Sequence, residues 1–162
     1  MHNKENRALK VAVFLVLLII FFSSAVAEQV SFGESFVQDN AGILSPEEKA
    51  LLSEILRQIY DSGRAEFAVV TINSLDGTPI EDYSYNLVEG RLGKEGADNG
   101  LLLLVAVEDR KYRFEVGRGI EDVLNDAKVG RIGRHYLVPN FKSGEYGKGI
   151  ILASVAIAKE LG

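Results

Sequence analysis

The stretch Ala97-Asp98-Asn99-Gly100-Leu101-Leu102-Leu103-Leu104-Val105-Ala106 decides the fold of this chain. It sets an acidic turn before an apolar run without polar alternation, which is typical of a strand buried on both faces. The turn Asp109-Arg110-Lys111 then leads into an alternating return strand that ends in Val116-Gly117-Arg118-Gly119-Ile120-Glu121. Antiparallel strands bring the start of one beside the end of the next, so polar residues from both turns should meet at one sheet edge. The residues expected there are Asp98, Asn99, Arg118 and Glu121.

The segments before this hairpin alternate between helical and strand patterns. Ser45-Pro46-Glu47-Glu48 predicts a helix start, with Ser45 as N-cap and Glu48 closing a capping box, and an apolar stripe continues to Ser62-Gly63. Residues 67–72 form a short β-branched strand pattern, and 79–92 have helical spacing. A helix between two strands makes those strands parallel neighbours.

The segments after the hairpin are helical. We expect Asp126 to cap a helix over 127–137 that Pro139 ends, and a last helix over 145–161. With helices available for both faces of the sheet, the predicted fold class is α/β: a three-layer α/β/α sandwich with a small mixed central sheet.

These motifs also carry a family resemblance. Asp98-Asn99-Gly100 before the leucine-rich strand, Asp109-Arg110-Lys111, and Val116-Gly117-x-Gly119-x-Glu121 with Asp126 resemble a TPM domain. So do Val37 to Ser45 upstream and Pro139 to Gly149 downstream. TPM domains occur in thylakoid-lumen, bacterial and archaeal envelope proteins and in some animal membrane proteins. The resemblance places the domain at residues 35–162, overlapping a lead-in segment at 28–44.

The N-terminus predicts export from the cytoplasm. Lys4, Arg7 and Lys10 precede the apolar run Val11 to Phe22, and small residues follow up to Ala27, the pattern of a signal peptide at residues 1–27. The apolar run is shorter than the roughly 20 residues of a spanning helix, so cleavage after Ala27 is favoured over an uncleaved anchor. In either case we expect an extracytoplasmic domain, secreted or held at the outer face of the membrane.

Composition excludes several functional classes. The net charge is -5 and becomes -7 without residues 1–27, which disfavours nucleic-acid binding. There is no cysteine, so disulfides, thiol nucleophiles and thiolate metal sites are excluded. Gly117 to Asp122 departs from a dinucleotide fingerprint at its third glycine and follows a hairpin strand, so no nucleotide cofactor is expected.

A metal site is the first candidate for function. Asp98, Asn99, Glu121 and Asp126 offer carboxylate and amide oxygens, a set that suits calcium, with magnesium as the alternative. The same residues are also ordinary turn and helix-cap residues, and both interpretations stay open. Some TPM domains bind calcium, so the resemblance favours the metal site. It also adds Asp39, which belongs to the family pattern, to the candidate ligands.

A second acidic group is expected at the opposite edge of the sheet, near the carboxyl ends of the parallel strands. Its members are Asp39, Asp76, Glu108 and Asp109. Turns commonly carry such residues, so a solvated loop cluster is the favoured interpretation. Asp39 is the exception, because it belongs to the family pattern; the alternative is that it only fixes the entry to the first helix.

Two functions compete. The resemblance implies a non-catalytic module that supports maintenance or assembly of a membrane-associated protein complex, as in photosystem repair or receptor modulation. It also implies an alternative, a metal-assisted acid phosphatase, in which Arg118 and Arg131 would bind phosphate beside the metal. No strong nucleophile constellation supports that alternative.

Overall fold

The computed structural model describes residues 36–162. The signal peptide predicted at 1–27 and the first part of the lead-in segment lie outside the described residues. Within them, the lead-in contains a three-residue strand, β1 (Val37–Asp39), which pairs with the sheet. A strand this short shows no periodicity in the sequence, which is why the pattern at 28–44 did not predict it.

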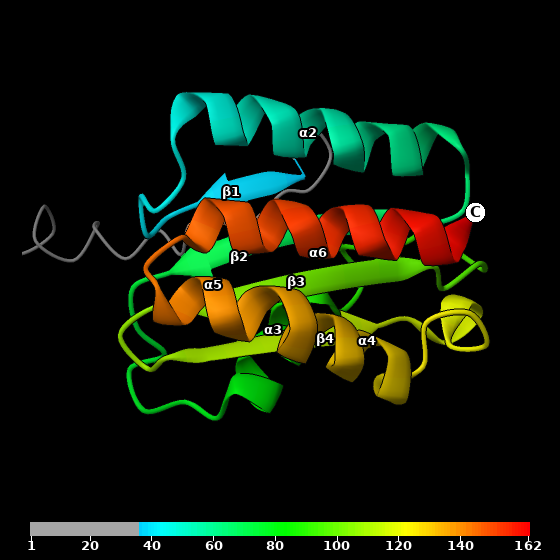
Figure 1. Ribbon diagram of the computed structural model, residues 1–162. Helices are drawn as coiled ribbons and strands as arrows, with labels where there is room; N and C mark the ends of the chain where they lie inside the picture. Colours follow the sequence, from blue (N-terminus) through cyan, green and yellow to red (C-terminus); the bar gives the residue numbers. More distant parts are fainter. Residues whose placement is uncertain (1–35) are drawn as a thin grey trace, which may run out of the picture. The chain divides into compact units, whose positions relative to one another are not determined.

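The sheet has four strands in the order β1-β2-β3-β4 (Figure 1). β1, β2 (Glu66–Ile72) and β3 (Gly100–Ala106) are parallel, and β4 (Lys111–Val116) pairs antiparallel with β3. All seven residues of β3 are buried, as its unbroken apolar run predicted. The sheet is therefore mixed, with β3 in its interior.

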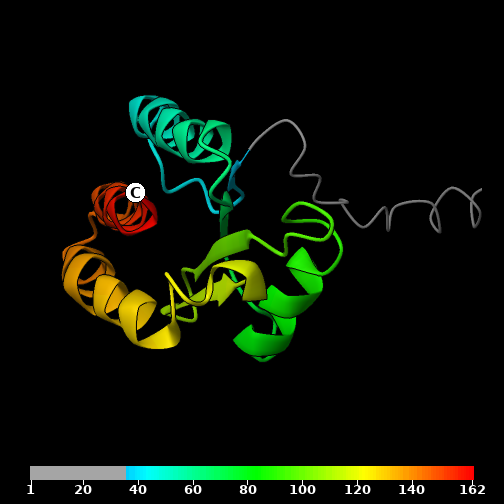
Figure 2. The same ribbon diagram turned by 90° about the vertical axis from the view of Figure 1, so that its right-hand side faces the viewer.

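Helices cover both faces of this sheet, which confirms the three-layer α/β/α sandwich. One face carries α2 (Pro46–Asp61), α6 (Tyr146–Leu161) and the continuous helical stretch α4 (Asp126–Ile132), η2 (Gly133–Leu137) and α5 (Val138–Lys142). The other face carries α3 (Ile80–Val88), as Figure 2 shows. Alternate residues of β3 serve the two layers: Leu101, Leu103 and Val105 belong to the main core with α2 and α6. No helix within residues 36–162 has the length and apolarity to cross a membrane.

Three helix boundaries differ from the sequence prediction. Asn125, not Asp126, caps α4, because its side chain accepts a hydrogen bond from Lys128 N at 3.1 Å; Asp126 is the first helical residue. Pro139 does not end the helix, because the π-helical turn η2 precedes it and Pro139 occupies the first turn of α5, where its missing N–H is tolerated. α3 ends at Val88, before the positive-φ Gly90.

A short 3₁₀ helix, η1 (Arg118–Ile120), follows β4. Gly117 and Gly119 allow this segment to lie directly against the turn before β3.

Candidate functional site

The turn before β3 and the end of β4 are joined through Asp98. Asp98 adopts a positive φ of 47°, which a short polar side chain tolerates in a turn. Its carbonyl accepts a hydrogen bond from Gly119 N at 2.9 Å, and its carboxylate accepts one from Arg118 N at 3.3 Å. The register of β3 on β4, with Leu101 opposite Val116, brings these segments together as the hairpin predicted.

Two glycines make this approach possible. A Cβ at Gly119 would overlap the carbonyl oxygen of Ala97, and one at Gly117 would overlap that of Asp98. Gly117 has an ordinary φ of -68°, so this glycine serves close approach of the chain and not an unusual backbone conformation.

A pocket of about 430 Å³ opens at this edge. Asp98, Arg118 and Glu121 line it, so three of the four residues expected to meet here do so. The fourth, Asn99, is buried beneath the turn: its Oδ1 accepts from Lys94 N at 2.9 Å and its Nδ2 donates to Arg64 O at 3.4 Å. Asn99 therefore ties together the loops that support the pocket.

Asp126 lies in a neighbouring pocket that it shares with Glu121 and Asn125. Glu121 is thus common to both pockets. Among residues 36–162, no group of three or more His, Cys, Asp or Glu side chains is arranged so that it could hold a metal ion. A cation at this edge would take its side-chain ligands from Asp98 and Glu121 and the others from backbone carbonyls and water, a hard-oxygen set that suits calcium or magnesium.

Sequence reasoning missed two further carboxylates of the Asp98 pocket, Glu89 and Glu115. Both already have partners. Glu89 accepts a hydrogen bond from the Tyr85 hydroxyl at 2.7 Å, which raises the pKa of Tyr85, and Glu115 pairs with Arg113 at 2.8 Å. They reach this edge through the packing of α3 against β4, a tertiary contact that no local sequence pattern specified.

The two arginines proposed for phosphate binding are separated. Arg118 lines the Asp98 pocket, whereas Arg131 lines a shallow pocket on α4 and η2 with Arg134 and His135. Only Arg118 is positioned beside the acidic residues of the candidate site.

Asp39 lies at the opposite edge, at the end of β1, and its side chain is 2% exposed. Its carboxylate forms an ion pair with Lys49 of α2 at 2.9 Å and accepts hydrogen bonds from the Thr71 hydroxyl (2.6 Å), Ile43 N (3.0 Å) and Leu44 N (3.1 Å). Burial raises its pKa, but these hydrogen bonds outweigh burial and hold the pKa below the usual 3.8. Asp39 therefore fixes the chain before α2 and is fully occupied by protein partners.

The other acidic residues at that edge also shape loops. Asp109 accepts a hydrogen bond from Leu75 N at 2.8 Å, Asp76 has a positive φ of 50°, and Glu108 N donates to Asn73 O at 2.9 Å. These contacts support the loop interpretation of the second acidic group.

The fold is similar to that of solved domains from several bacterial proteins. The N-terminal domain of a protein from P. gingivalis, solved by solution NMR, is 35% identical, with a TM-score of 0.72, and the match covers 78% of this chain and 82% of that one. The N-terminal domain of the cg2496 protein of Corynebacterium glutamicum is 18% identical (TM-score 0.64, covering 85% and 86%) and shows the shared fold. The BA42 protein of the psychrophilic bacterium Bizionia argentinensis is 24% identical (TM-score 0.59, covering 73% and 81%) and also shows the fold.

The family match is direct. Residues 37–160 match the TPM domain, and the chain belongs to this family. No curated protein matches the sequence.

Proposed function

We propose that this protein is an extracytoplasmic TPM domain that binds a divalent cation, calcium first and magnesium as the alternative, at the Asp98 pocket. In the bound form it supports maintenance or assembly of a membrane-associated protein complex. The observation that carries the proposal is the shared pocket of Asp98 and Glu121 in a chain of this family. The N-terminal apolar run supports an extracytoplasmic location.

The chemistry of the pocket favours weak, reversible binding. Asp98 and Glu121 are exposed carboxylates without an ion-pair partner among the described residues. The Asp98 carboxylate accepts one backbone hydrogen bond, from Arg118 N, so both carboxylates retain lone pairs for a cation. Arg118 lies in the same pocket, and its positive charge repels a bound cation and lowers the affinity for it. Few charged ligands and one nearby cation predict an affinity in the micromolar to millimolar range that is usual for extracellular calcium modules.

Calcium titration followed by backbone NMR tests the cation site. Asp98→Asn should weaken calcium binding at least about tenfold, because one formal charge and one ligand oxygen are lost. Asp76→Asn is the matched control: this aspartate also occupies a positive-φ turn, but at the other edge, and its substitution should leave the affinity unchanged. Loss of binding in Asp76→Asn with normal binding in Asp98→Asn would show that the proposed edge is wrong.

The supporting role is tested in membranes of the source cell. A tagged protein should co-purify with a defined membrane complex in the presence of calcium and lose that association with Asp98→Asn but not with Asp76→Asn. If the association is insensitive to calcium and to both substitutions, the protein binds its partner without the cation, and the proposed link between the two is wrong.

Acid phosphatase activity is the second candidate, favoured by one observation: Arg118 lines the same pocket as the two carboxylates. A cation held there could activate water while Arg118 binds a phosphate oxygen. We expect little hydrolysis, because Arg131 lies in a different pocket and leaves a single cationic donor. Metal-dependent turnover of a phosphomonoester that disappears in both Asp98→Asn and Arg118→Ala would reverse the order of the two candidates.

A further inference from the structure

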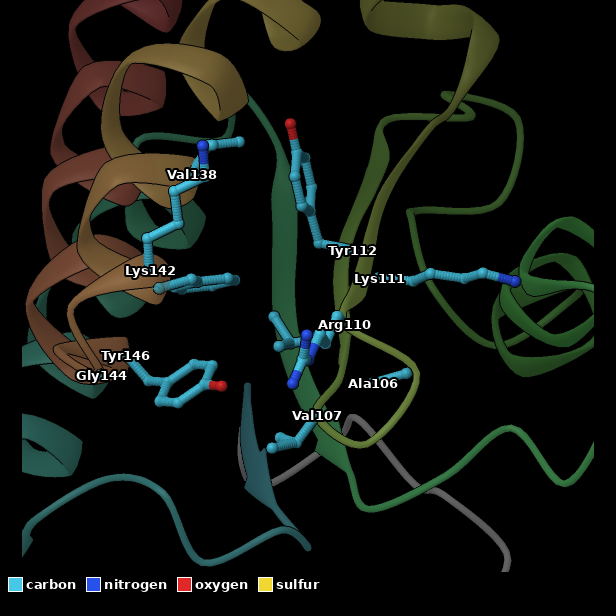
Figure 3. Close-up of a pocket in the computed structure, with 11 residues that line it drawn as sticks. Ala106, Val107, Arg110, Lys111, Tyr112, Val138, Lys142, Gly144 and Tyr146 are labelled. Carbon is cyan, nitrogen blue, oxygen red and sulfur yellow. The ribbon is translucent and has the colours of Figure 1, made fainter.

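A larger pocket lies at the other end of the sheet from Asp98. It has a volume of about 600 Å³ and opens between the β3–β4 hairpin and the junction of α5 with α6 (Figure 3). This volume is within the roughly 300–1,000 Å³ of small-molecule sites. The pocket also sits beside the carboxyl end of β3, and ligands of open α/β sheets commonly bind at the carboxyl ends of strands.

Three aromatic rings, from β4, α5 and α6, line this pocket in a connected series. The rings of Tyr112 and Phe141 meet edge to face, with centroids 6.4 Å apart and an interplanar angle of 89°. Phe141 continues to Tyr146, with centroids 4.9 Å apart at 40°. Val107 and Val138 add aliphatic surface. Such a lining favours a ligand with a flat, apolar body.

Three cationic residues belong to the lining of the same pocket, Arg110, Lys111 and Lys142, and no carboxylate does. The guanidinium of Arg110 points into the cavity, and Lys142 extends along α5 toward Val138 (Figure 3). Neither side chain has a hydrogen bond or ion pair with any residue in the described part of the chain. Arg110 also holds a positive φ of 53° at the hairpin turn, an uncommon conformation for a long side chain. The net charge of the chain is -5, so this pocket differs from the protein as a whole in its positive charge. Arg110 and Lys142, both unpaired, lie among the three aromatic rings and are complementary to an anion.

From these observations we propose that the pocket binds a small organic anion, with a carboxylate or phosphate group held by Arg110, a planar apolar body against Tyr112, Phe141 and Tyr146, and Lys142 on α5 adding positive charge to the pocket. This site shares no residue with the Asp98 pocket and does not depend on the function proposed for that edge.

The test is an NMR titration of the protein with four probes. Phenylacetate and phenyl phosphate carry both the ring and the anion, benzyl alcohol carries the ring alone, and inorganic phosphate carries the anion alone. We expect saturable shifts of the Tyr112, Phe141 and Gly144 amides with the first two probes and at least about tenfold weaker binding of the other two. The ratio between phenylacetate and phenyl phosphate distinguishes a carboxylate ligand from a phosphate ligand. Benzyl alcohol binding as tightly as phenylacetate would overturn the proposal, and so would the absence of shifts with both anionic probes at about 10 mM.

Substitutions locate the charge. Arg110→Gln should weaken binding of the anionic probes about tenfold, because it removes a charge-assisted hydrogen bond, and Lys142→Gln should weaken it less, because it removes only a nearby positive charge. Lys111→Gln is the matched control: Lys111 also belongs to the pocket lining and its substitution removes the same charge, but its side chain points away from the cavity (Figure 3). It should leave the affinity unchanged. Equal weakening by Lys111→Gln and Arg110→Gln would show a diffuse electrostatic effect and contradict the site.

Discussion

At the scale of single residues, Asp39 shows how one buried carboxylate can connect three elements. It ends β1, accepts a hydrogen bond from Thr71 of β2, and forms an ion pair with Lys49 of α2. Asp39→Ala should lower the free energy of unfolding by about 2–4 kcal/mol, because it leaves the Thr71 hydroxyl and two backbone N–H groups without their acceptor. Urea denaturation measures this change. Asp61→Ala, which removes an exposed pair with Arg57, is the control and should have little effect.

The contribution of Asp39 should also depend on pH. Its folded pKa lies below the ordinary value of 3.8, so the unfolded chain takes up the proton first as the pH falls. The stabilisation is therefore complete above the unfolded pKa and is lost as the pH drops through the folded value. The difference in stability between the wild type and Asp39→Ala should stay constant from about pH 7 down to about pH 5, where the carboxyl group is ionised in both the folded and the unfolded chain, and should shrink below about pH 4. A difference that grows in acid would contradict this assignment.

Gly119 gives a further prediction at this scale. Gly119→Ala should destabilise the protein by about 1–3 kcal/mol, because its Cβ would meet the backbone carbonyl of Ala97, which cannot move without shifting the turn at Asp98. Gly130→Ala is the contrasting change. There the nearest atom is Nη1 of Arg134 at 3.2 Å, the mobile end of a side chain, and alanine is the better helix former by about 0.5–1 kcal/mol. Thermal unfolding of the two variants should shift in opposite directions.

At the scale of elements, the capping box of α2 is coupled to α6. Ser45 Oγ accepts from Glu48 N at 3.1 Å, Glu48 Oε2 accepts from Ser45 N at 2.8 Å, and the Cα of Gly147 in α6 packs against the Glu48 carboxylate. Ser45→Ala should cost about 1 kcal/mol. Gly147→Ala should displace Glu48 and break the other half of the box.

Because both substitutions act on one box, the double variant should lose less stability than the sum of the two single losses. A double-mutant cycle in urea measures the coupling. The pair Ser45→Ala with Asn125→Ala, which acts on two separate caps, should be additive. Additivity in the first pair would show that α6 does not support the cap.

The elements that sequence predicted well are those specified by local signals. Ser45 with Glu48 marks the start of α2, and the unbroken run after Gly100 marks β3. The prediction that Pro139 ends the helix was wrong, because a π-helical turn before it changes which backbone N–H groups the helix requires. That turn has no signature in the sequence. β1 exists because β2 offers it a paired edge, which is a tertiary effect.

At the scale of the whole molecule, topology explains which parts of the site were predictable. The hairpin alone brings Asp98 beside Arg118 and Glu121, so adjacency in the sheet sufficed. Whether a side chain faces solvent or the interior was not predictable in this way. The side chain of Asn99 is buried and bonds two loops, and that of Asp39 is enclosed by protein donors. Arg131 lies on α4, in a different pocket from Arg118.

The last prediction concerns the domain as a folding unit. The main core includes residues from Leu44, in the loop before α2, to Leu161, near the C-terminus. In this core α2 packs against α6. A chain of residues 28–162 should therefore unfold in one cooperative transition, with the same urea midpoint as the full-length protein in detergent. Ending the chain at residue 145 removes α6 and with it Ile150, Ala153 and Ile157, all fully buried, so that fragment should not fold. A cooperative transition in the shorter fragment, or a lower midpoint for 28–162, would show that the unit is bounded differently from the sheet and helices that define it.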